Sequence, residues 1–64
     1  MEYTNSQMRE LIGEHIHSKR DREILSMFYV DDISQEIIAE KFKMSVRGIQ
    51  YIISRNRDTI SKNL

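Results

Sequence analysis

Residues 33–56, with the sequence ISQEIIAEKFKMSVRGIQYIISRN, decide the fold of this chain. Ser34 and Ser45 each precede a run whose apolar residues recur at helical spacing, and serine is a preferred residue at a helix N-cap. Lys43 and Met44 interrupt the first run after about two turns. The stretch therefore predicts two helices separated by about three residues, the second of which follows Ser45.

The expected contact between these two helices is apolar. Its packing positions are Ile33, Ile38, Ala39, Phe42, Met44, Val46, Ile49 and Ile52. Ala39 stands where the two helices approach closely, so that position requires a small side chain. Two helices joined by a tight turn, the second capped by serine and polar on its free face, indicate a helix-turn-helix over about residues 33–56.

Two more helices are expected upstream of this motif. Thr4 and Gln7 have the spacing of a capping box. The apolar residues that follow share one helical face: Met8, Leu11, Ile12 and Ile16. Ser18 begins a second helix that runs to about Val30, with Asp21 at the positive end of the helix dipole. The last helix is expected to continue through Ile60 to Leu64.

Composition supports an all-helical chain and argues against an enzyme. Proline is absent and only two residues are glycine, which favours helices over strands joined by glycine-rich turns. We therefore expect an all-α, four-helix domain over residues 1–64, with the helix-turn-helix at its C-terminal end. No nucleophile, base and orienting group can be assembled from the sequence, and so short a chain has little room for a water-excluding pocket.

No metal, cofactor or membrane is expected to bind. The chain has no cysteine, and His15 and His17 point to different sides of a helix. No apolar run reaches the length of a signal sequence or a membrane span, so we expect a cytoplasmic protein.

Charge is distributed unevenly along a chain whose formal net charge is zero. Residues 1–40 carry four basic and nine acidic side chains, a net charge of −5, whereas residues 41–64 carry six basic and one acidic, a net charge of +5. Such asymmetry can orient a molecule on a polyanion even without a net charge. The positive end coincides with the predicted helix-turn-helix.

The free face of the last helix provides the candidate DNA contacts. These are Ser45, Arg47, Gly48, Gln50, Tyr51, Ser54 and Arg55, with Lys43 just before the helix. Arg47 can bind guanine in a bidentate manner and Gln50 can pair with adenine, while Ser45, Tyr51 and Arg55 suit phosphates. The first hypothesis is therefore a sequence-specific transcriptional regulator that inserts the helix at about residues 45–56 into the major groove of double-stranded DNA.

Three segments together resemble region four of bacterial sigma factors. They are DREILSMFY at 21–29, ISQEIIAEKF at 33–42 and MSVRGI at 44–49, within a similarity that covers about residues 18 to 57. The resemblance implies promoter-type DNA recognition by the fourth helix and, as in sigma factors, contact with the RNA polymerase flap. The parts of a sigma factor that melt promoters cannot fit in 64 residues, so we expect a small stand-alone regulator, of the kind that phages and mobile elements carry.

Three residues depart from the family pattern. Lys43 occupies a turn position where the family commonly has glycine, so it must adopt a left-handed conformation or the turn must differ. Gly48 stands where a longer polar side chain often contacts DNA, and Ile37 replaces a usual acid.

Two alternatives remain open at the level of sequence. The near-neutral charge, Ile37 and Gly48 also fit a protein-interaction module of the same fold that docks on RNA polymerase or on another regulator. Separately, a stripe on the last helix has the spacing of a helix-pair seam: Ile49, Ile53, Asn56 and Ile60. This stripe predicts either a homodimer through the C-terminal helix or packing of that helix on Leu11 and Ile12 of the first.

Overall fold

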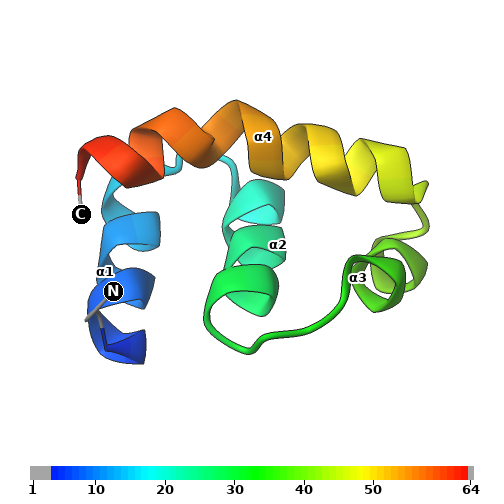
Figure 1. Cartoon of the computed structure of the whole chain (residues 1–64), viewed down its shortest axis with the longest axis horizontal. Helices are drawn as coiled ribbons and strands as arrows, with labels where there is room; N and C mark the ends of the chain where they lie inside the picture. Colours follow the sequence, from blue (N-terminus) through cyan, green and yellow to red (C-terminus); the bar gives the residue numbers. More distant parts are fainter. Residues whose placement is uncertain (1–3, 64) are drawn as a thin grey trace.

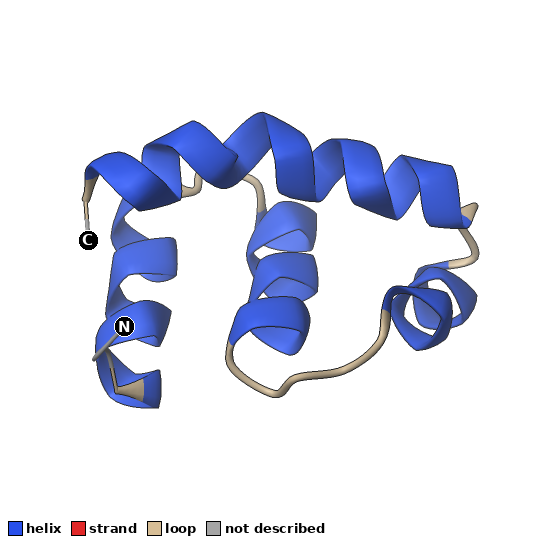
Figure 2. Ribbon diagram, viewed as in Figure 1, coloured by secondary structure: helices blue, strands red, loops and turns tan. Residues whose placement is uncertain are grey.

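The chain is all-helical in the computed structural model, which describes residues 4–63 (Figure 1, Figure 2). Its helices are α1 (Asn5–His15), α2 (Lys19–Tyr29), α3 (Gln35–Phe42) and α4 (Val46–Lys62). The predicted fold class and the order of the helices are therefore confirmed. The last helix includes Ile60, as expected, but it ends at Lys62 with Asn63 as its C-cap, before the expected end at Leu64; Leu64 itself lies outside the described residues.

Each helix begins at a polar cap that the sequence predicted. The side chains of Thr4, Ser18, Ser34 and Ser45 accept hydrogen bonds from the backbone three residues ahead, which occupies donors that the helix leaves unpaired. At Thr4 the reciprocal bond from its own N–H to Gln7 Oε1 is also present, at 2.9 Å, so the capping box is complete. Local hydrogen bonding thus fixes where the helices start.

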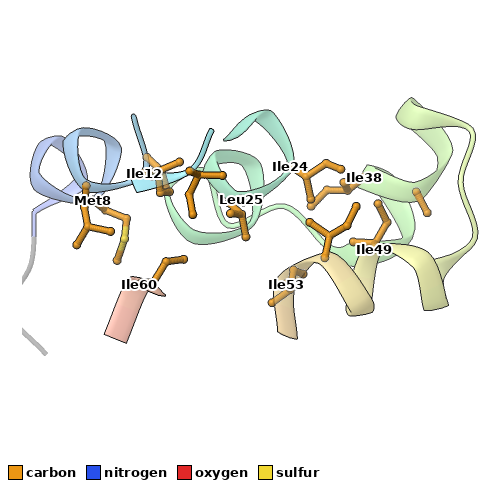
Figure 3. Packing of buried hydrophobic residues seen from close by; sticks show 13 residues of the cluster. Met8, Ile12, Ile24, Leu25, Ile38, Ile49, Ile53 and Ile60 are labelled. Atoms are coloured by element: carbon orange, nitrogen blue, oxygen red, sulfur yellow. The ribbon is translucent and has the colours of Figure 1, made fainter. Parts of the chain in front are cut away.

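α4 spans the molecule and contacts all three other helices. Its first turns lie next to α3 and its last turns lie next to α1, with α2 between them (Figure 1). One apolar cluster fills the space under α4, and Figure 3 shows Ile49 at the α3 end and Ile60 at the α1 end. Ile24, Leu25 and Ile38 are completely buried within this cluster.

The stripe that suggested a homodimer lies inside this core. Ile49, Ile53 and Ile60 are buried among residues of the same chain. Asn56 donates from Nδ2 to the carbonyl oxygen of Ile52, at 2.8 Å. The alternative in which the last helix packs on α1 is therefore correct, and the seam is not available to a second copy.

Lys43 ends α3 in the left-handed conformation, with φ 56° and ψ 43°, which is the first of the two alternatives that the departure from glycine left open. Its N–H donates to the carbonyl oxygen of Glu40, at 3.3 Å, and the N–H of Met44 donates to that of Ala39, at 2.9 Å. These two bonds form the Schellman motif that commonly ends a helix. The chain therefore makes the usual tight turn between α3 and α4 with a lysine in the glycine position.

Asp32, between α2 and α3, is a second left-handed residue, with φ 58°. This conformation was not predicted from the sequence, although aspartate adopts it more readily than most residues. None of the helices among residues 4–63 is both long and apolar enough to cross a membrane.

Candidate nucleic-acid interface

α4 divides cleanly into a buried face and an exposed face. Ile49, Ile52 and Ile53 are buried against the other helices. The predicted DNA contacts lie on the side that remains: Lys43, Ser45, Arg47, Gln50, Tyr51, Ser54 and Arg55 are exposed, and Gly48 is half-buried. Packing of the apolar stripe therefore leaves these side chains accessible. Their role in binding DNA remains a prediction.

The start of α4 is polar, and side chains pack closely against the backbone at Gly48. The Ser45 hydroxyl oxygen accepts a hydrogen bond from the N–H of Gly48, at 3.0 Å, so its hydrogen is still free to donate to a ligand. A Cβ added at Gly48 would lie 3.2 Å from the terminal methyl of Met44 and 3.4 Å from Ser45 Oγ. The first turn of α4 contains no acidic residue. The partial positive charge at this helix end therefore remains to attract phosphate.

Arg47 is the basic side chain in the first turn of α4, and it is exposed. Lys43 is exposed just before the helix. Neither takes part in an ion pair within residues 4–63. Both cations are therefore available to an external anion.

Gln50 is held by α3. Its Nε2 donates to Oε1 of Gln35, the first residue of α3, at 3.1 Å. A glutamine amide has two N–H donors and one oxygen acceptor, so Gln50 keeps one donor and its acceptor for a base edge. This link between the two helices orients a side chain predicted to recognise adenine. Gln35 was not predicted from the sequence to be part of the site.

Arg55 is engaged within the protein. Its Nη2 donates to Oδ2 of Asp21, whose side chain is 3% exposed. Arg20 also approaches the same carboxylate, with Nε and Nη2 both 3.4 Å from Oδ1. Asp21, predicted to interact with the dipole of α2, is therefore also the internal partner of a predicted phosphate contact.

Tyr51 projects from the exposed face with 63% of its surface accessible. The guanidinium carbon of Arg55, one turn further along α4, lies 5.5 Å from the centroid of its ring. This separation falls within the range of a cation–π interaction. Arg55 thus links two residues: it contacts the buried Asp21 of α2 on one side and the exposed Tyr51 of α4 on the other.

A second exposed feature lies away from these residues. An open groove is lined by α1, α2 and the end of α3, and its basic side chains are Arg9, Lys19, Arg22 and Lys41. Ile37 is 56% exposed near the start of α3.

Residues 4–63 bring together no group of three or more histidine, aspartate or glutamate side chains that could hold a metal.

Comparison with protein-family models shows a similarity over most of the chain. The family model described as Sigma-70, region 4 matches residues 18–60, more than half of the 64-residue chain. The matched segment includes α2, α3 and most of α4, and leaves out α1. No curated protein and no solved structure shows a significant match to the chain.

Proposed function

Because the chain belongs to the sigma-70 region 4 family, whose members are DNA-binding helix-turn-helix domains, we propose that it is a sequence-specific transcriptional regulator. In this proposal the exposed face of α4 enters the major groove of double-stranded DNA. The observation that supports it is that Arg47, Gln50, Tyr51 and Ser54 are exposed on α4 while the opposite face is packed in the core.

Each exposed side chain is assigned a contact by its chemistry. Arg47 donates two hydrogen bonds to the O6 and N7 of a guanine, and Gln50 pairs with the edge of an adenine. Ser45, Tyr51 and Lys43 bind phosphates around the start of α4, with Ser54 further along the same face. The half-buried Gly48 lets the DNA backbone or a base approach the helix. The proposal places the protein in the cytoplasm and requires no cofactor.

A salt series tests DNA binding directly. Wild-type affinity for a random duplex is expected to fall linearly with the logarithm of salt concentration, because each neutralised phosphate releases counterions. Arg47→Ala removes a charge at the proposed interface, so both affinity and slope should fall. Lys62→Ala removes the same charge from the far end of α4 and should leave both almost unchanged. Equal losses in the two variants, or no wild-type binding, would refute the proposal.

A protein partner is the second candidate function. The sigma-70 region 4 family binds RNA polymerase as well as DNA. Exposed Ile37 favours this alternative here, because a large apolar side chain on a helix surface suits a protein contact better than a phosphate backbone. Purified RNA polymerase should then retain wild-type protein in a pull-down and lose Ile37→Glu. Retention of both forms, or of neither, argues against docking through α3.

A further inference from the structure

Asp21 is the one buried polar or charged residue among residues 4–63, with 2% of the whole residue exposed. Both of its carboxylate oxygens are bonded, Oδ2 to Arg55 and Oδ1 to the more distant Arg20. A carboxylate removed from water requires such partners, because an unpaired buried charge is strongly destabilising. The fold thus needs Arg55 at this position, independently of any DNA.

Arg55 connects this buried charge to the surface. Its side chain is 48% exposed, and its guanidinium carbon lies 5.5 Å from the ring centroid of Tyr51. We propose that Arg55 is a positioning residue: held by Asp21, it fixes the Tyr51 ring on the outer face of α4, and Tyr51 makes the phosphate contact at this turn. The proposal rests on the DNA-binding function proposed above.

The geometry favours Tyr51 over Arg55 as the direct contact. Arg55 donates through Nη2 to the buried carboxylate of Asp21, so its charge is already neutralised inside the protein, and a phosphate contact by its remaining N–H groups gains less than one made by a free cation. As a unit, the Asp21–Arg55 pair is neutral, so it displaces few counterions from DNA. Tyr51 is 63% exposed and accessible to a phosphate. Because its ring is already held against a guanidinium, it loses less conformational entropy when it binds that phosphate.

A double-mutant cycle in DNA binding tests this assignment. Arg55→Gln and Tyr51→Ala should each weaken binding to a random duplex about three- to tenfold, the amount expected for one hydrogen bond. The double variant should bind no more weakly than Tyr51→Ala, because Arg55 acts through Tyr51. Additive losses would instead show that the two side chains contribute separately, which a purely structural role or a direct contact predicts.

The salt slope provides an independent measurement. Arg55→Gln should leave the slope of log affinity against log salt close to the wild-type value. Lys43→Ala removes an exposed cation assigned to phosphate, so it should reduce the magnitude of the slope by about 0.9, as expected when one phosphate contact is lost. A reduction of about 0.9 in Arg55→Gln would identify Arg55 as a direct phosphate contact and overturn the proposal.

Folding is measured separately by circular dichroism during urea denaturation. Arg55→Gln should reduce the equilibrium constant for folding at least about tenfold, and Asp21→Asn in the same chain should restore most of it by removing the unpaired charge. If Arg55→Gln fails to fold, Arg55→Lys replaces it in the double-mutant cycle, because lysine keeps the charge opposite Asp21 but lacks the planar group that stacks on Tyr51.

The outcomes separate this assignment from the function on which it depends. Absence of wild-type DNA binding refutes the proposed function and the positioning role with it. Wild-type binding with additive effects of Arg55 and Tyr51, or no restoration of folding by Asp21→Asn, refutes the positioning role alone.

Discussion

Replacement of Lys43 by glycine is expected to stabilise the protein. Lys43 has φ 56° and ψ 43°, a conformation that costs an L-residue about 1–2 kcal/mol, whereas glycine adopts it freely. Glycine also gains freedom in the unfolded chain, which offsets about 0.4–1 kcal/mol of that benefit. Lys43→Gly should therefore raise the free energy of unfolding by about 0.5–1 kcal/mol, and the melting temperature by several degrees for a domain of this size.

Lys41→Gly is the matched control for this prediction. Lys41 is exposed and lies within α3, so glycine there should lower the free energy of unfolding by about 1 kcal/mol. Both variants lose the same side chain, and only the backbone conformation differs. Thermal melts followed by circular dichroism should show shifts of opposite sign. Destabilisation by both variants would refute the explanation from backbone conformation.

Three further predictions concern the caps and the core. Ser45→Ala should lower the free energy of unfolding by about 0.5–2 kcal/mol in urea denaturation, because the Gly48 N–H loses its partner; an unchanged midpoint would contradict this. Ile49→Ala should lower the free energy of unfolding by about 2–5 kcal/mol, because Ile49 is completely buried where α4 meets α3. Its melting temperature should therefore fall far more than that of the variant Ile37→Ala at an exposed position. Ile60→Ala should destabilise the chain without changing its mass in sedimentation equilibrium, since Ile60 packs in the core of its own chain; dissociation of a dimer would contradict that packing.

The features that the sequence predicted well are those set by nearby residues. The starts of α3 and α4 followed from Ser34 and Ser45, because an N-cap bond spans only three positions. The left-handed conformation of Lys43 was one of the two outcomes that its place at a family glycine position left open. The side of α4 that stays exposed followed from the spacing of its isoleucines, which places Tyr51 opposite the core.

The features that the sequence could not settle depend on contacts between distant residues. Asp21 and Arg55 are 34 positions apart, and an acid early in α2 is explained equally well by the helix dipole. The apolar stripe that includes Ile60 suits an intramolecular core or a seam between two copies, because either surface buries the same side chains. In the sequence, Gln35 is indistinguishable from any polar residue in the first turn of a helix. Its hydrogen bond to Gln50 depends on how α3 and α4 pack together.

Insertion of α4 into the major groove can be tested at a single atom of DNA. After the preferred site has been selected from random duplexes, the guanine assigned to Arg47 is replaced by 7-deazaguanine, which lacks the N7 acceptor of the major groove. We predict that this change weakens wild-type binding by about 1 kcal/mol or more, the scale of one charge-assisted hydrogen bond, and leaves Arg47→Ala unaffected. Equal affinity of the wild-type protein for the two duplexes, at every guanine of the site, would contradict major-groove recognition by Arg47.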